Sequence, residues 1–253
     1  MKELLNRPWH LTEDGEVFLF DKPYTWTSFD LVNKFRYLAC KRLDIKKLKV
    51  GHAGTLDPLA TGLMIVCTGR CTKKIDKLQS GVKEYIATIK LGETTPSFDL
   101  ETEPDKQYPY KHITEEMVRE VLKSFVGTIE QVPPAYSAIS VNGKRAYKYA
   151  RKGQEVELKP RILVIDEIEL LDYDLPLIKI RVVCSKGTYI RALARDIGEA
   201  LQSGGYLTAL RRTRIGDFLI EDALSIEGIE EVIRDHVDPI LKVEKDNKEL
   251  NNN

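Results

Sequence analysis

The chain has 253 residues, of which 42% are hydrophobic and 31% charged, as is typical of a globular protein. No apolar run reaches the ~20 residues that cross a membrane, and the N-terminus lacks the apolar core of a secretory signal. These features exclude a membrane-spanning class and predict a cytoplasmic protein. The 39 basic and 39 acidic residues cancel, but residues 1–215 carry a net charge of +7 and residues 216–253 a net charge of −7. A basic body of this kind is compatible with a polyanionic partner.

Apolar periodicity predicts the elements of the first half of the chain. The first predicted helix, over 28–42, is expected to have Ser28 as its N-cap and to end near Arg42. The region 93–112 is polar and is expected to be an irregular connection. The predicted elements, in order, are a strand over 17–21, the helix over 28–42, a strand over 63–67 and a strand over 83–91.

The second half alternates helices and strands irregularly. The predicted elements are a helix over 114–125, a strand over 127–132, a short basic helix over 144–152, strands over 161–171 and 177–184, and a helix over 188–201. Sequence neighbours among these strands are expected to pair. The fold class is therefore predicted to be α+β, with a mixed, largely antiparallel sheet flanked by helices.

The four cysteines do not form a metal-binding pattern. Cys67 and Cys71 are separated by three residues, but no second pair of cysteines or histidines lies nearby to complete a zinc site. We therefore expect reduced, mostly buried thiols and no metal.

The run from Gly51 to Leu63 places one carboxylate, Asp57, in a glycine-rich loop. Glycine permits turns that other residues avoid and lets a ligand approach the backbone. Pro58 disfavours the helical conformation at Asp57, so the carboxylate is expected on an extended piece of chain. The alternative is a structural turn that Asp57 caps. The length of the run and the motifs elsewhere favour a chemical role.

A second segment, from Ser185 to Arg195, follows a predicted strand and opens a helix. Backbone N–H groups at such a position face anions. Tyr189 beside Arg191 suits nucleobases and phosphates, because rings and guanidinium groups stack on bases. The alternative is a basic, solvated helix face.

Basic clusters lie at residues 41–49, 142–152 and 210–214. Each one alone is typical of a protein surface, but three in a near-neutral chain favour RNA or DNA as a partner. The chain has no dinucleotide-binding glycine motif, no phosphate-binding loop and no nucleophilic-serine motif. The remaining candidate for chemistry is a carboxylate that acts without a cofactor.

These segments resemble a known enzyme family. Residues 51–62 closely resemble the catalytic motif of the TruB branch of the pseudouridine synthases, and residues 131–151 are similar to the RNA-gripping insert of that branch. Three further motifs are matched, in family order, by residues 21–28, 83–85 and 185–191. The resemblance covers about residues 17–218 and implies the pseudouridine synthase fold.

The resemblance implies isomerisation of uridine to pseudouridine at position 55 of tRNA, in the TΨC loop. The C1′–N1 bond breaks, and the base rejoins through C5. Asp57 matches the catalytic aspartate, and the residues leave open whether it attacks C1′, adds to the uracil ring or acts as a base. Arg191 matches the arginine that pairs with this aspartate. A guanidinium partner keeps a carboxylate ionised. Tyr85 matches the tyrosine that stacks on the flipped base, and Tyr189 a second tyrosine near that base.

Other residues are implied to contact RNA. His52 matches a histidine that engages the opened T loop, and Lys22 a lysine that supports the active-site region. The remaining expected contacts are Gly54, Thr55, Lys83, Lys186, Lys144, Arg145 and Arg151. The resemblance implies no metal and no organic cofactor. The expected partner is the T-arm stem-loop of tRNA, bound by a monomer with no obligate protein partner.

The chain departs from the family pattern at two places. Thr25 stands where the family usually has glycine, and a β-branched residue disfavours a positive φ, so that turn is expected to differ. Too few residues follow Asp217 for the PUA domain of many relatives, so we expect it to be absent. The expected organisation is a catalytic domain over 1–240, with its insert at about 131–152, and a disordered tail over 241–253.

Three alternatives compete with this interpretation. One is a pseudouridine synthase for another RNA, such as a guide-directed ribosomal RNA enzyme. Another is a non-catalytic chaperone that binds the T loop of tRNA. A metal-dependent aspartyl phosphohydrolase fits less well, because no second aspartate accompanies Asp57 in an Asp-x-Asp pair.

Overall fold

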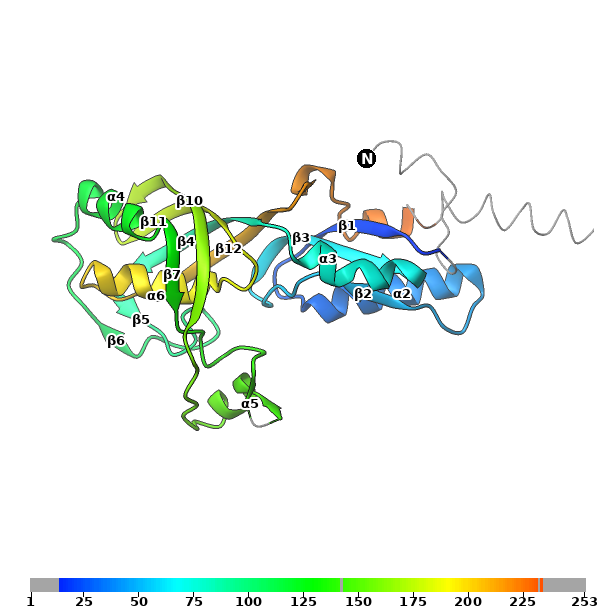
Figure 1. The fold of residues 1–253 in the computed structure, drawn as a ribbon, viewed down its shortest axis with the longest axis horizontal. Coiled ribbons are helices and arrows are strands. Elements are labelled where there is room, and N and C mark those ends of the chain that lie inside the picture. Colours follow the sequence, from blue (N-terminus) through cyan, green and yellow to red (C-terminus); the bar gives the residue numbers. More distant parts are fainter. Residues whose placement is uncertain (1–13, 142, 232, 234–253) are drawn as a thin grey trace, which may run out of the picture. The chain divides into compact units, whose positions relative to one another are not determined.

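The computed structural model describes residues 14–141, 143–231 and 233 (Figure 1). The chain divides into two compact units. The first contains the residues up to Gly81 and from Arg212 onward, and the second contains Val82–Arg211. Strand β12 (Gly205–Ile215) belongs to both, because its first residues lie in the second unit and its last residues in the first. The tail expected over 241–253 lies outside the described residues.

The first unit is built on two long paired strands. Strands β1 (Val17–Lys22) and β3 (Ala60–Thr68) run antiparallel, in a register from Val17 opposite Cys67 to Lys22 opposite Gly62. The end of β12 follows β3 in the strand order. Two short strands complete this part of the sheet: β2 (Val50–His52) pairs with β3, and β13 (Phe218–Leu219) pairs with β12.

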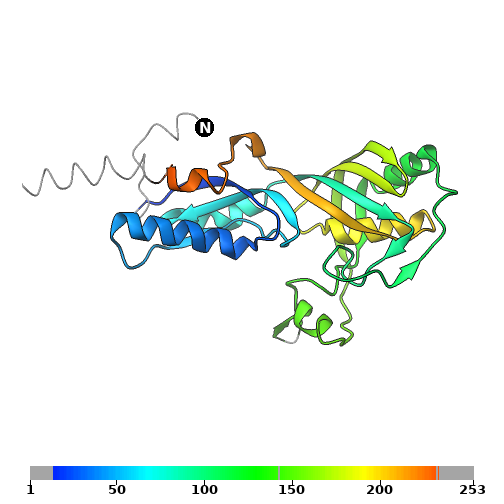
Figure 2. The ribbon, with the colours of Figure 1, turned by 180° about the vertical axis from the view of Figure 1, so that it is seen from behind.

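Helix α2 (Ser28–Leu43) lies along these strands, as both ribbon views show (Figures 1 and 2). Its Phe35 ring lies 4.8 Å from the ring of Phe18 and 5.4 Å from that of Phe20. The helix begins with a capping box, in which Thr27 is the N-cap and its hydroxyl accepts a hydrogen bond from the Asp30 N–H. The predicted cap, Ser28, is therefore wrong by one residue. Ser28 is buried and instead bonds the loop before β3.

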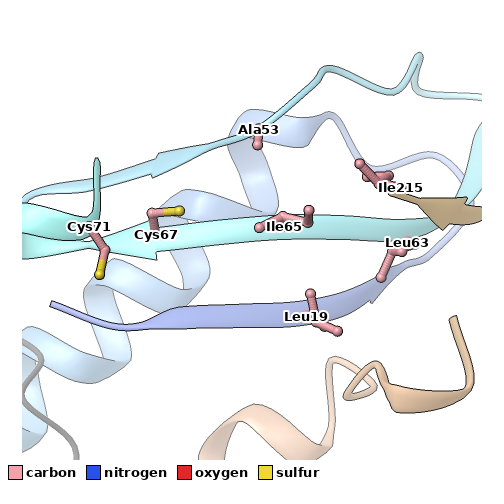
Figure 3. Packing of buried hydrophobic residues seen from close by; sticks show 7 residues of the cluster. All are labelled: Leu19, Ala53, Leu63, Ile65, Cys67, Cys71 and Ile215. Atoms are coloured by element: carbon pink, nitrogen blue, oxygen red, sulfur yellow. The ribbon is translucent and has the colours of Figure 1, made fainter. Parts of the chain in front are cut away.

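The hydrophobic cluster of the first unit gathers around β3 (Figure 3). Leu63, Ile65 and Cys67 come from that strand, and the cluster is completed by Leu19, Ala53, Cys71 and Ile215. Ala53 ties the start of the Asp57 loop to this core, and its N–H also bonds the Ile65 carbonyl at 2.9 Å. The short helices η1 (Gly69–Lys74), α3 (Ile75–Gln79) and η2 (Ile220–Asp222) also belong to this unit.

The second unit contains the larger part of the sheet, in the strand order β12-β4-β11-β10-β7. Strand β4 alternates between buried and half-buried side chains along its whole length, so one of its faces packs into the core. The pairs β4–β11, β10–β11 and β7–β10 are antiparallel. The strands are β4 (Lys83–Leu91), β7 (Gly127–Gln131), β10 (Arg161–Asp174) and β11 (Leu177–Cys184).

Two helices cover this sheet. Helix α4 (Glu115–Ser124) packs on β10 and on α6 (Ile190–Ala200), and α6 also packs on β4. The insert projects away from the sheet of its unit in both ribbon views (Figures 1 and 2) and carries β8 (Ser140–Val141), β9 (Lys144–Arg145) and α5 (Ala146–Ala150).

The α+β class and the largely antiparallel sheet are confirmed, and every strand and helix predicted from the sequence is present within a few residues of its expected bounds. Several elements were not predicted, among them the β8–β9 hairpin, β13 and the short helices η1, α3 and η2. The region 93–112 contains a small hairpin of β5 (Glu93–Thr94) and β6 (Lys106–Gln107), and β2 and β12 were missed. No helix of the described residues is long and apolar enough to span a membrane. The cytoplasmic location stays a prediction.

Candidate active site

Asp57 lies in the loop that joins β2 to β3 in the first unit, and its side chain is half-buried. Two neighbours anchor the loop. Leu56 is buried in the protein interior, and the Ser28 hydroxyl of α2 both accepts from the Leu56 N–H at 2.9 Å and donates to the Leu56 carbonyl at 3.1 Å. After Asp57 the chain turns back into β3, where the Ala60 N–H bonds the Asp57 carbonyl at 3.1 Å. The loop backbone is therefore fixed on both sides of the carboxylate.

Gly54 allows the turn at the start of this loop. Its φ is +101°, a conformation that L side chains rarely adopt. Gly54 is buried, whereas Thr55 is exposed. Direct RNA contact by these two residues stays a prediction.

Lys22 places a buried cation beside the loop. Its side chain is fully buried at the end of β1, and its ammonium donates to the carbonyls of Pro23, Trp26 and Pro58 at 2.9, 2.6 and 3.3 Å. Burial lowers the pKa of Lys22 to about 8, and the negative charge of Asp57 opposes this shift. The lysine thus connects the start of α2 to the residue after Asp57.

His52 immediately precedes the loop, in β2, where it pairs with Val66. Burial lowers the pKa of His52 below its ordinary value, so the imidazole is neutral at neutral pH. A neutral ring has one donor and one acceptor nitrogen, and the Nδ1 of His52 is buried. Contact with RNA stays a prediction for this residue.

Arg191 belongs to the second unit, at the start of α6, and is 5% exposed. Its guanidinium donates to the carbonyls of Ser97 at 3.2 Å and Tyr136 at 2.9 Å. Its Nε lies 3.6 Å from a carboxylate oxygen of Asp99, which is also buried. Residues from the loop after β5 and from the insert therefore orient this arginine within its own unit. The pairing with the catalytic aspartate stays a prediction.

Tyr189 occupies the N-cap position of α6. The side-chain amide of Gln131 holds its backbone from both sides, because the Gln131 oxygen accepts from the Tyr189 N–H at 2.9 Å and the Gln131 nitrogen donates to the Tyr189 carbonyl at 3.3 Å. Gln131 is fully buried at the end of β7. The half-buried Tyr189 ring is thus carried on a rigid backbone.

Tyr85 and Lys83 lie on the buried face of β4 and are 8% and 5% exposed. In the register with β11, Tyr85 is opposite Val182 and Lys83 is opposite Cys184. The strand therefore fixes the Tyr85 ring against the core of the second unit. Its stacking role, and RNA contact by Lys83, stay predictions.

The other residues expected to contact RNA differ in their surroundings. Lys144 and Lys186 are exposed. Arg145 donates to the Ala138 carbonyl at 2.7 Å. Arg151 forms an ion pair with Glu101 at 2.6 Å and also lies over the Tyr147 ring. The two arginines therefore stabilise the insert, while the two lysines present their charge to solvent.

Several residues that hold the proposed site residues in place were not identified from the sequence. They are Ser28, Asp99, Gln131 and Arg212, whose guanidinium bonds carbonyls of the Asp57 loop and of β3. The available signal at Gln131 was its position just before the double proline of the insert, in a segment already matched to the family. Ser28 also lies in a segment matched to the family, whereas Asp99 and Arg212 gave no local signal, because each acts on a partner far away in the sequence. Among the residues described, no group of three or more histidine, cysteine, aspartate or glutamate side chains is placed to hold a metal ion.

Comparison with known families defines the class of protein. The model of the TruB family pseudouridylate synthase N-terminal domain matches residues 41–190, and that of the tRNA pseudouridylate synthase B C-terminal domain matches residues 191–242. The chain belongs to the TruB family of pseudouridylate synthases.

Individual relatives carry the name tRNA pseudouridine synthase B. The relative from Parabacteroides distasonis is 66% identical over 92% of this chain and 97% of its own length. The relative from Phocaeicola vulgatus is 65% identical over 87% of this chain and 93% of its own, and that from Flavobacterium johnsoniae is 51% identical over 87% and 97%.

Solved structures show the same fold. The chain matches the archaeal box H/ACA sRNP Nop10–Cbf5 complex with a TM-score of 0.64 and 27% identity, over 91% of this chain and 58% of that one. It matches an H/ACA RNP bound to a substrate RNA containing 2′-deoxyuridine with a TM-score of 0.61 and 27% identity, over 86% and 53%. The chain thus spans little more than half the length of these two proteins. Together with the family assignment, they confirm the pseudouridine synthase fold.

Proposed function

We propose that this protein isomerises uridine to pseudouridine in tRNA. The observation that carries the proposal is the high identity, over nearly the full length of both chains, to relatives named tRNA pseudouridine synthase B. The residues proposed to carry the chemistry are each held by their own unit: Asp57 in the first, and Tyr85, Tyr189 and Arg191 in the second.

The reaction conserves every atom of uridine. The C1′–N1 bond breaks, the uracil turns over, and a C1′–C5 bond forms. C5 loses its proton, and N1 gains one. Neither an oxidant nor a reductant is required, so the protein's task is to hold the base and to supply a carboxylate and a path for the proton. Asp57 is the proposed carboxylate, and the buried ammonium of Lys22 is a positive charge that favours its ionised form.

The uridine must leave its stack before Asp57 can reach it. Extruding a base costs a few kcal/mol, which contacts in the new environment must offset. The Tyr85 ring is held on a strand and Tyr189 on a rigid helix N-terminus. Aromatic stacking on the flipped uracil by Tyr85 is the proposed compensation.

The proposed target is position 55 in the T arm, which is the site implied by the resemblance of residues 51–62 to the family's catalytic motif. The exposed lysines Lys144 and Lys186 are proposed to contact the phosphates of the T stem. The enzyme is proposed to act as a monomer.

The test is incubation of the protein with unmodified tRNA, followed by carbodiimide-stop mapping of pseudouridine. Wild type should give one stop at position 55. Asp57→Asn keeps the size of the side chain but removes its charge and its basicity, so it should give no stop while still binding tRNA. Turnover by Asp57→Asn at the wild-type rate would overturn the assignment of Asp57.

Two further outcomes separate the alternatives. A ribosomal RNA fragment in the same assay should remain unmodified, and modification of that fragment instead of tRNA would support a synthase for another RNA. Tight tRNA binding by wild type without any pseudouridine would support the T-loop chaperone.

A further inference from the structure

Arg212 is a buried cation of β12, and its guanidinium donates hydrogen bonds to three backbone carbonyls. The side chain is 1% exposed, although the sequence places it within a basic cluster. Its Nε donates to the Leu63 carbonyl at 2.8 Å, its Nη2 to the Gly54 carbonyl at 3.2 Å, and its Nη1 to the Thr55 carbonyl at 3.4 Å. All four residues belong to the first unit.

These three carbonyls lie on both sides of Asp57. Gly54 and Thr55 precede it in the loop, and Leu63 follows it in β3. A buried charge is costly unless polar partners surround it. The planar fork of a guanidinium holds its N–H donors in fixed directions, so it bonds adjacent carbonyls in one defined geometry, whereas the donors of an ammonium rotate freely. The burial of Arg212 therefore depends on the loop holding the conformation that presents Asp57.

The backbone of Arg212 is fitted to the same loop. Gly62 has a φ of +108°, and a Cβ at this position would overlap the carbonyl of Arg212. Gly62 is also the register partner of Lys22, whose ammonium bonds the Pro58 carbonyl. The loop thus has a guanidinium on its first residues and an ammonium on the residue after Asp57.

We propose that Arg212 is a positioning residue, which holds the backbone of residues 54–63 so that the Asp57 carboxylate is presented in its reactive place. The proposal deepens the proposed function and rests on it for the activity readout. Arg212 acts through carbonyls of the loop and is not itself a catalytic residue. A displacement of a reacting group by about 1 Å can cost roughly 100-fold in rate, so a loosened loop should affect chemistry more than binding.

The variants are Arg212→Met, which keeps the length of the side chain, and Arg212→Lys, which keeps its charge but loses the fork. The matched control is Arg36→Met. Arg36 belongs to α2 of the same unit and donates to the Val50 carbonyl at 3.2 Å, outside the Asp57 loop. Unfolding midpoints are measured for all, so that rates are compared only where the protein is folded.

Single-turnover rates with saturating protein and tRNA dissociation constants are the first readout. Arg212→Met should lower the rate roughly 10- to 100-fold, with a dissociation constant within about twofold of wild type. The rate of Arg212→Lys should lie between those of wild type and Arg212→Met. Arg36→Met should keep the wild-type rate. A wild-type rate in Arg212→Met, or an equal loss in Arg36→Met, would overturn the proposal.

Amide hydrogen exchange gives a second readout that needs no activity. The Leu56 N–H is bonded by the Ser28 hydroxyl and the Ala60 N–H by the Asp57 carbonyl. Both should exchange faster in the Arg212 variants than in Arg36→Met, and equal protection would count against the proposal. If Arg212→Met does not fold, Arg212→Lys carries both readouts. If wild type is inactive but the variants show this difference in exchange, the proposed function fails and the positioning role of Arg212 stands.

Discussion

At the scale of single residues, the buried ammonium of Lys22 should make stability depend on pH. Its pKa is about 8 in the folded protein, against 10.5 for an ordinary lysine. Between these values the unfolded chain binds more protons than the folded one, so the free energy of unfolding rises with pH across this window, by up to roughly 3 kcal/mol. Below about pH 8 the lysine is charged in both states and adds no pH dependence.

Urea unfolding of wild type and Lys22→Met between pH 7 and pH 10.5 measures this effect. The difference between the two proteins isolates Lys22 from other groups that titrate in the same window. We expect wild type to gain stability relative to Lys22→Met as the pH rises. Parallel curves for the two proteins would show that Lys22 titrates normally.

Tyr85 should contribute to catalysis through its ring. Tyr85→Phe keeps the stacking surface, whereas Tyr85→Ala removes about 1–3 kcal/mol of base stacking. We therefore expect a small loss of activity for Phe and a loss of roughly tenfold or more for Ala. Because Tyr85 is 8% exposed, the Ala variant also leaves a cavity, so thermal unfolding is measured beside the rate. A Phe variant slower than the Ala variant would contradict stacking.

Thr25 adopts a conformation that its side chain did not predict. A β-branched side chain was expected to avoid a positive φ, yet Thr25 has a φ of +70°. The turn between β1 and α2 therefore keeps a left-handed residue at the family's glycine position. Two residues fix the ends of this turn: Lys22, whose buried ammonium bonds the Trp26 carbonyl, and Thr27, which caps α2.

Replacing Thr25 by glycine should relieve this conformation. The left-handed region costs an L-residue about 1–2 kcal/mol. Glycine removes this cost, but its greater conformational entropy in the unfolded chain offsets part of the stabilisation. We expect Thr25→Gly to raise the free energy of unfolding by about 0.5–1 kcal/mol. Thr27→Gly is the control with the opposite sign, because it removes the hydroxyl of an N-cap in extended conformation. A loss of stability in Thr25→Gly would contradict the strain.

At the scale of elements, periodicity was sufficient where burial is one-sided. Strand β4 and helix α4 follow their predicted bounds closely, since their apolar spacing and the Thr114 cap are local signals. The cap of α2 was misplaced because Thr27 and Ser28 are adjacent hydroxyl residues. Only the Leu56 backbone, far away in the sequence, determines that Ser28 turns inward.

Strand β12 was missed for a related reason. Its arginines were interpreted as part of a basic cluster for RNA or DNA, but Arg212 is 1% exposed, and carbonyls about 150 residues earlier accept its hydrogen bonds. Asp99 likewise gains its role from Arg191, a long-range partner. The sequence motifs identify the residues proposed to touch the substrate, whereas the residues that hold them are defined only by tertiary contacts.

At the scale of the whole molecule, the uneven charge predicts how RNA binding should respond to salt. Each lysine that contacts a phosphate adds about one unit to the slope of log affinity against log salt. Lys144→Ala in the insert should weaken tRNA binding and lower this slope by about 1. Lys123→Ala is the control, because this exposed lysine of α4 is paired with Glu120. Equal slopes in wild type and Lys144→Ala would remove the insert lysine from the RNA contact surface.

The course of the chain through the two units also constrains how the protein is made. The first unit is discontinuous: the ribosome synthesises its β1, α2, β2 and β3 first, then the whole of Val82–Arg211, and only afterwards Arg212. Domains tend to fold during synthesis from the N-terminus, but here the Asp57 loop cannot bind its guanidinium until some 150 further residues have been added. An early segment of this unit therefore has to wait for a much later one, and the Asp57 carboxylate reaches its final setting only after Arg212 has been synthesised.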